Sequence, residues 1–87
     1  MKCTILHETR GRMRVHLCCR RMTLEQADVL EYYLRAQDGV QEVKVYDRTR
    51  DAVVVYDAER GSIIRALGAF SFAKAEAMEL VPEHTSR

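Results

Sequence analysis

Alternating apolar and polar residues mark the clearest element of the chain, between residues 12 and 18. On an extended backbone, Met13, Val15 and Leu17 fall on one face. The opposite face carries the polar residues Arg12, Arg14, His16 and Cys18. The pattern predicts a half-buried strand that brings the adjacent residues Cys18 and Cys19 to the start of the next element.

Helical spacing follows this strand. The segment Thr23-Leu24-Glu25-Gln26 has the form of a capping box, which predicts a helix that begins at Leu24. Its apolar face continues to about Gln37, and Gly39 is a suitable left-handed terminator. A second helix is expected to begin within residues 57–61 and to run to about Phe70. Its expected buried side is Ile63, Ile64, Leu67 and Phe70.

Three further segments read as strands. Residues 40–46 alternate with Val43 and Val45 inward, and residues 52–56 return after a polar turn over residues 47–51. In this hairpin we expect Ala52, Val54 and Tyr56 to face the core, which leaves Val53 and Val55 on the open side of the sheet. A short last strand is expected over residues 75–81, with Pro82 after it. The apolar run over residues 3–7 is either another strand or a leading extension.

The element order predicts the fold class. Strand, helix, strand, strand, helix, strand with right-handed crossovers gives the α+β ferredoxin-like βαββαβ sandwich. This is a four-stranded antiparallel sheet with two helices on one face and with the first and third strands in the centre. We expect residues 1–81 to form this single domain and residues 82–87 to be a polar tail or the start of a linker.

Composition excludes several functions. The 87 residues carry a net charge of +1, whereas a general nucleic-acid binder is usually strongly basic, so we expect no nucleic-acid partner. The chain shows no Ser-His-Asp set, no paired carboxylates and no phosphate-binding glycine loop, so we expect no catalysis by this domain. Acylphosphatase, an enzyme of the same topology, needs an asparagine, and this chain has none. No signal peptide and no apolar run of about 20 residues is evident, which predicts a cytoplasmic segment without membrane contact of its own.

The cysteines suggest a metal site. Three cysteines, two of them adjacent, do not form a disulfide scaffold, so we expect reduced thiols. The thiolates of Cys18 and Cys19 suit a soft transition-metal ion, Cu(I) or Zn(II), and His16 is a candidate third ligand. The alternative is a small buried Cys19 with an incidentally exposed Cys18. For Cys3 and Met22 a structural role is favoured over metal binding.

Two motifs in the middle of the chain resemble a known family. Asp38-Gly39-Val40-Gln41-Glu42-Val43-Lys44-Val45, followed by Asp51-Ala52-Val53-Val54-Val55-Tyr56-Asp57, is similar to the centre of heavy-metal-associated domains. The leader His7-Glu8-Thr9-Arg10-Gly11-Arg12-Met13-Arg14-Val15 resembles a divergent branch at the cytosolic N-terminus of metal-transporting P-type ATPases. The resemblance implies the ferredoxin-like fold and a transporter context.

This chain lacks the two cysteines with which typical members of that family bind metal. Its Cys-x-x-Cys loop corresponds to positions near Thr23 and Gln26 of this chain, neither of which supplies a thiolate. Cys18 and Cys19 lie a few residues earlier. Metal binding through these two residues is therefore inferred from their own placement.

Two functions follow from these features. The first is a metal-binding or regulatory N-terminal domain of a P-type metal-transporting ATPase, with Cys18, Cys19 and His16 as ligands. Its partners would be the metal ion and other domains of a parent ATPase, or a second copy in a homo-oligomer. The alternative is a metal-free docking or dimerisation module that uses the open face of the sheet.

Overall fold

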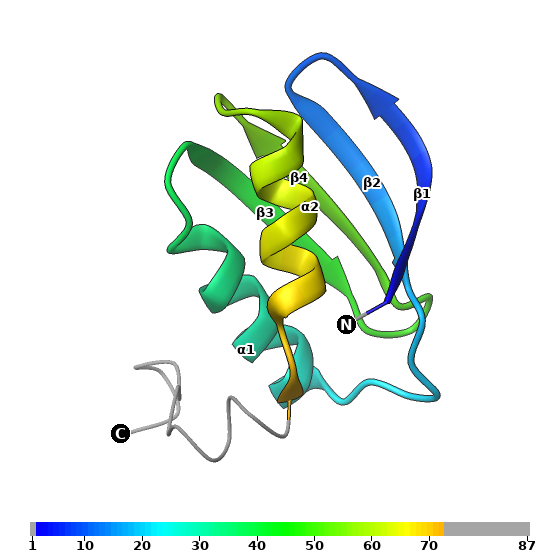
Figure 1. Ribbon diagram of the computed structural model, residues 1–87. Coiled ribbons are helices and arrows are strands. Elements are labelled where there is room, and N and C mark those ends of the chain that lie inside the picture. The colour runs from blue at the N-terminus through cyan, green and yellow to red at the C-terminus, as the bar shows by residue number, and fades with distance from the viewer. Residues whose placement is uncertain (1, 73–87) are drawn as a thin grey trace.

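The computed structural model describes residues 2–72, and Figure 1 traces their path. These residues form six elements in chain order. They are β1 (Cys3–Thr9), β2 (Arg12–Leu17), α1 (Leu24–Arg35), β3 (Val40–Tyr46), β4 (Asp51–Tyr56) and α2 (Arg60–Ala69).

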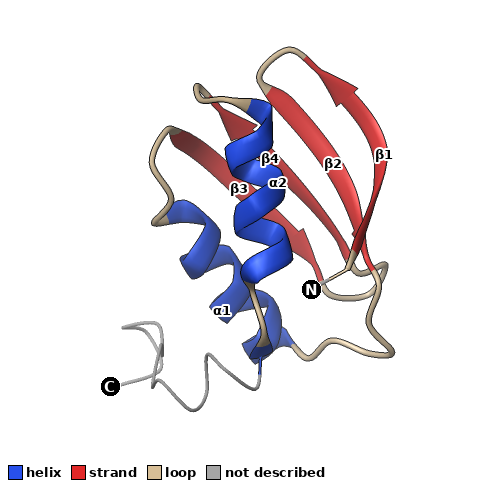
Figure 2. Cartoon of the chain, viewed as in Figure 1, coloured by secondary structure: helices blue, strands red, loops and turns tan. Residues whose placement is uncertain are grey.

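The described strands form one antiparallel sheet in the order β1-β2-β4-β3. Both helices lie on the same face of this sheet, as Figure 2 shows. The ferredoxin-like α+β fold predicted from the sequence is therefore confirmed, with β2 and β4 as the central strands.

The outer neighbour of β2 is the N-terminal strand β1, so the apolar run over residues 3–7 is part of a strand. The strand predicted over residues 75–81 lies outside the described residues. A register shift between Ile5 and His7 makes a β-bulge in β1 opposite β2. Within residues 2–72, β1 is thus a bulged edge strand of a complete four-stranded sheet.

The core lies between the sheet and the two helices. The alternation predicted for β2 is confirmed, since Met13, Val15 and Leu17 are at most 1% exposed. Strands β3 and β4, both helices and the residue after α2 add further buried members: Leu30, Leu34, Val43, Ala52, Val54, Tyr56, Ile63, Leu67 and Phe70. Ile64 was expected on the buried side of α2 but is 36% exposed, because α2 turns this residue toward the rim beside β1.

Local interactions define the first helix. The capping box is confirmed: Gln26 N donates to Thr23 Oγ1 and Thr23 N donates to Gln26 Oε1, each at 3.0 Å. Helix α1 ends at Arg35, two residues before the predicted end. Gly39 has a φ of +83°, and a Cβ at this position would lie 2.6 Å from Ala58 Cβ. Only glycine fits this turn without strain.

An ion pair joins the N-terminal end of α2 to strand β1. The side chain of Arg60 at the start of α2 forms an ion pair with Glu8 of β1. Tyr33 of α1 donates a hydrogen bond to the carbonyl oxygen of Ala66 in α2 at 2.8 Å. The first contact joins α2 to the sheet and the second joins the two helices to each other. The opposite face of the sheet is covered by neither helix (Figure 2).

Candidate metal site at the end of strand β2

The two adjacent cysteines lie in a tight turn directly after β2. Cys18 N donates to the carbonyl oxygen of Lys2 at 2.9 Å, which extends the pairing of β1 with β2 by one residue. Cys19 N then donates to the carbonyl oxygen of Leu17 at 2.8 Å. A bond between residues i and i+2 is the mark of a γ-turn, so the backbone makes a tight local turn at Cys18.

Cys18 lies on the open face of the sheet. Its side chain is exposed, and its Sγ lies 3.6 Å from Thr4 Oγ1. Thr4 pairs directly with His16 across the two strands, and directly opposed residues share a face. The prediction that Cys18 and His16 share one face is therefore confirmed.

Cys19 lies on the other side of the turn. It is partly buried and packs against the core cluster. The structure therefore does not bring Cys18, Cys19 and His16 into one ligand cluster. Among residues 2–72, no group of three or more His, Cys, Asp or Glu side chains is arranged to hold a metal ion.

His16 is held by a carboxylate from the neighbouring strand. Its Nδ1 donates to Asp51 Oδ1 at 2.9 Å, and Arg14 Nη2 donates to Asp51 Oδ2 at 3.1 Å. The hydrogen bond from His16, with a further one from Arg14, lowers the pKa of Asp51. Because an ionised carboxylate only accepts hydrogen bonds, the hydrogen between Asp51 and His16 lies on Nδ1 of the histidine, and Nε2 is the ring nitrogen that does not contact Asp51.

Sequence reasoning placed Asp51 in a polar turn and missed this role. Asp51 is the first residue of β4 and pairs with His16 of β2. Its side chain is only 10% exposed. Its role depends on the register of β4 against β2, which pairs Asp51 with His16 and which no local sequence pattern gives.

Arg50 forms hydrogen bonds to the loop that carries Cys18 and Cys19. Its Nη1 donates to the carbonyl oxygens of Cys19 at 3.1 Å and Arg20 at 2.5 Å. Its backbone has a φ of +59°, a left-handed conformation that is uncommon for a residue with a side chain. Leu17 N donates to the carbonyl oxygen of Arg50 at 2.7 Å. The β3–β4 turn therefore sets the position of the cysteine loop through both backbone and side chain.

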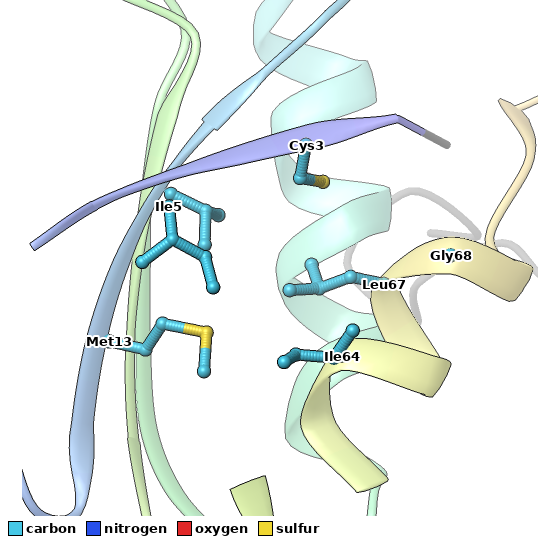
Figure 3. Close-up of a pocket in the computed structure, with 7 residues that line it drawn as sticks. Cys3, Ile5, Met13, Ile64, Leu67 and Gly68 are labelled. Carbon is cyan, nitrogen blue, oxygen red and sulfur yellow. The ribbon is translucent and has the colours of Figure 1, made fainter. Parts of the chain in front are cut away.

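The third cysteine lies at the same end of the β1–β2 hairpin. Cys3 pairs with Leu17 and lines an apolar cavity of about 150 Å³ between β1, β2 and α2, together with Ile5, Met13 and Leu67 (Figure 3). Burial raises the pKa of the Cys3 thiol, and the nearby thiols of Cys18 and Cys19 act in the same direction. None of the three cysteines takes part in a disulfide bond in this structure.

Other predictions for this region are also resolved. Met22 is 7% exposed and belongs to the core, which agrees with the structural role expected for it. Val53 does lie on the open face but is only 8% exposed, between Arg14 and Lys44 in the register. Both cations lie about 6 Å from the ring centre of Tyr46. Of the two valines expected on the open face, Val53 is therefore buried and Val55 is half-buried.

None of the helices within residues 2–72 has the length and apolar character required to cross a bilayer. This finding concerns only the described part of the chain.

The amino-acid sequence of the chain was compared with those of known proteins and protein families. No protein-family model matches the chain. A zinc-exporting P-type ATPase of Mycobacterium marinum is 37% identical to it over 78 residues. The matched stretch is 90% of this chain and 11% of the length of that relative. The chain is thus similar, over most of its length, to one segment of a zinc-exporting P-type ATPase.

Proposed function

We propose that this chain is a zinc-binding regulatory domain of a P-type metal-transporting ATPase, located on the cytoplasmic side and related to heavy-metal-associated domains. The observation that carries the proposal is the 37% identity over 90% of the chain to a protein named as a zinc exporter. The same comparison favours Zn(II) over Cu(I) as the bound ion. The proposed ligands are Cys18, Cys19 and His16.

The arrangement around His16 supports its role as a ligand. Histidines that bind metal commonly donate their other ring N–H to a carboxylate, which fixes the ring and raises its basicity. Asp51 supplies such a carboxylate at 2.9 Å from Nδ1. The ligating atom would therefore be Nε2, on the same face as the exposed sulfur of Cys18. One nitrogen and one sulfur donor suit Zn(II), which accepts both.

Cys19 would join these two ligands through a local rearrangement. Its backbone N–H is held by the carbonyl oxygen of Leu17 in the turn, while its side chain packs against the core. Opening this turn would let Cys19 approach the face that carries Cys18. A site with three protein ligands leaves a fourth position for water or for an incoming ligand. Such an open position suits the transfer of zinc by ligand exchange.

Zinc titration of the reduced chain tests this proposal. A chromophoric chelator that competes for Zn(II) would report the dissociation constant and the stoichiometry. We expect one ion per chain and a loss of affinity of about tenfold or more when Cys18→Ser and Cys19→Ser are combined. Cys3→Ser is the matched control, because it removes a thiol of the same hairpin that is not a proposed ligand. Equal zinc affinity in the double variant and the unchanged chain would refute the proposed ligand set.

A metal-free docking module is the second candidate. It is favoured by the absence, within residues 2–72, of a ready cluster of three or more metal-binding side chains. Its partner would be another domain of the same ATPase or a second copy, held against the open face of the sheet. Zinc affinity that is weak and unaffected by the cysteine substitutions would support this reading. Substitution of Tyr46, 40% exposed on that face, would then disrupt the association.

A further inference from the structure

We propose that one end of the domain is a docking surface for an acidic segment of a partner protein. This surface, the basic end, consists of exposed or half-buried cations from three segments of the chain: Lys2, Arg20, Arg21, Arg48 and Arg50. The inference depends neither on zinc binding by the cysteines nor on the open face of the sheet.

Hydrogen bonds bring the three segments together. Cys18 N donates to the carbonyl oxygen of Lys2 at 2.9 Å, which holds the start of the chain beside the β2–α1 loop. Arg50 of the β3–β4 turn donates to the carbonyl oxygens of Cys19 and Arg20 in the same loop. Figure 1 shows the start of β1, this loop and the β3–β4 turn at one end of the sheet. The basic end is therefore a product of the fold, because its members lie far apart in the sequence.

Positive charge predominates at this end. Among residues 2–72, no member of the basic end forms a salt bridge with an acidic side chain. The loop, the turn and the residues next to them also carry three acidic residues: Glu25, Asp47 and Asp51. The carboxylate of Asp51 already accepts hydrogen bonds from Arg14 and His16. The five cations therefore leave an excess of positive charge here, although the whole chain has a net charge of only +1.

The opposite end of the sheet lacks this excess of positive charge. The α1–β3 turn and the β4–α2 loop meet there, because Asp57 N donates to the carbonyl oxygen of Gly39 at 2.7 Å. Three exposed carboxylates of these connections offset Arg10 and Arg12 of the β1–β2 hairpin: Asp38, Asp57 and Glu59. An acidic partner would therefore be attracted to the basic end and not to the opposite end.

The composition of the basic end favours a protein as the partner. Four of its five cations are arginines, and arginine binds a carboxylate through two parallel N–H donors. Tyr46, which is 40% exposed, is the last residue of β3 and directly precedes the β3–β4 turn. Arginine and tyrosine are the residue types that, with tryptophan, contribute most to the binding energy of protein–protein interfaces.

Two other anionic partners fit this surface less well. Single-stranded nucleic acid stacks on several aromatic side chains, whereas residues 18–23 and 46–50 contain one aromatic residue, Tyr46. An anionic membrane attracts cations that are clustered in one continuous segment or on one amphipathic helix. The cations of the basic end come from three separate segments instead.

Titration of the nitrogen-15-labelled chain with a hexaglutamate peptide, followed by amide chemical shifts, tests the inference. We expect shift changes confined to Lys2, residues 18–23 and residues 46–50. Raising the NaCl concentration from about 0.02 M to about 0.2 M should weaken binding, because salt screens exposed charges. Shift changes on other surfaces of the domain would overturn the inference.

A triple variant removes charge from the basic end. Arg20→Gln, Arg21→Gln and Arg48→Gln together should weaken peptide binding about tenfold, because each exposed ion pair contributes a modest amount. Arg50 is kept, since its side chain holds the loop. The shift map of the unchanged chain decides the location of the surface independently of whether this variant folds.

A second triple variant is the matched control. Arg10→Gln, Arg12→Gln and Arg65→Gln change the net charge by the same amount, but these exposed residues lie outside the basic end. We expect the affinity for hexaglutamate to fall by less than about twofold. An equal loss in both triple variants would show that only net charge matters and would overturn the inference.

Two further probes test the class of partner. They are a thymidine hexanucleotide of similar charge and vesicles of phosphatidylserine and phosphatidylcholine, each at the same salt concentration. Weaker binding of both than of hexaglutamate would support a protein partner. Tighter binding of either, lost in the basic-end variant, would overturn that choice in favour of nucleic acid or membrane. None of these measurements involves zinc, so their failure is distinguishable from failure of the proposed function.

Discussion

Asp51 of β4 accepts a hydrogen bond from Nδ1 of His16 in the adjacent strand β2, at 2.9 Å. The carboxylate is only 10% exposed, and its second oxygen accepts from Arg14 at 3.1 Å. One acidic side chain thus connects the two central strands and orients the histidine nearest to the cysteine loop. Both the stability of the sheet and the chemistry of the candidate site depend on this contact.

The first prediction concerns stability and pH. Because its pKa is lowered in the folded chain, Asp51 stabilises the fold above its unfolded pKa of about 4, and this contribution is lost as the pH falls through the folded pKa. We expect Asp51→Asn to lower the free energy of unfolding by about 1 kcal/mol at pH 7, a modest value because both partners are partly exposed. Urea unfolding at pH 7 and in acid measures the difference. An effect that is the same at both pH values would contradict this account.

The second prediction concerns zinc. Loss of the carboxylate behind a metal-binding histidine commonly weakens binding by about 10- to 100-fold. On the proposed function, Asp51→Asn should therefore raise the dissociation constant for Zn(II) without removing a ligand. Chelator competition measures this change. Glu42→Gln, which neutralises an exposed carboxylate of β3, is the control and should leave the constant unchanged. Equal constants for all three chains would exclude His16 as a ligand held by Asp51.

The third prediction compares two glycines. Gly39 has a positive φ, and a Cβ there would lie 2.7 Å from the carbonyl oxygen of Asp57, so Gly39→Ala should destabilise the fold by about 1–3 kcal/mol. Gly68 lies in α2, and a Cβ there meets nothing within 4 Å. Gly68→Ala should stabilise by about 0.5–1 kcal/mol, because alanine has the higher helix propensity. Chemical unfolding of both variants should give shifts of opposite sign, and shifts of the same sign would be inconsistent with this backbone geometry.

The fourth prediction concerns the start of α1. Thr23→Ala removes the side-chain oxygen that accepts from Gln26 N, so the free energy of unfolding should fall by about 1 kcal/mol. Thr49→Ala, in the turn between β3 and β4, is the matched control and should change it by less than about 0.5 kcal/mol. Thermal and urea unfolding measure both. A larger loss for Thr49→Ala than for Thr23→Ala would show that the cap contributes little.

The fifth prediction concerns the hydrogen bonds from Arg50 to the loop that carries Cys18 and Cys19. Arg50→Lys keeps the charge but loses the guanidinium group whose Nη1 contacts the carbonyl oxygens of Cys19 and Arg20. We expect faster amide hydrogen exchange in residues 18–21 and little change in α2. Arg48→Lys, in the same turn, is the control. If the loop exchanges at the same rate in both variants, Arg50 does not hold it.

The local features of this chain could be predicted from the sequence. The alternation over residues 12–17, the capping box at Thr23 and the turn at Gly39 each depend on a few neighbouring residues, and the structure confirms all three. The pairing of β2 with β4 followed from connection rules alone. These features place Cys18 and His16 on one face.

The remaining features depend on contacts between distant residues. The ion pair of Asp51 with Arg14 requires the register of β4 against β2, and no local pattern gives this register. The left-handed backbone of Arg50 is unexpected because glycine or asparagine usually occupies such a position. The sequence also left the identity of the strand over residues 3–7 open, because a short bulged strand has a weak alternation signal.

The γ-turn at Cys18 has a practical consequence for chemical labelling. Because Cys18 is exposed and Cys19 packs against the core, a thiol-alkylating reagent should modify the first residue rapidly and the second slowly. Two consecutive residues would then report on different events. The alkylation rate of Cys18 would measure the reaction of an exposed thiol with the reagent. The alkylation rate of Cys19 would measure how often local unfolding exposes its side chain.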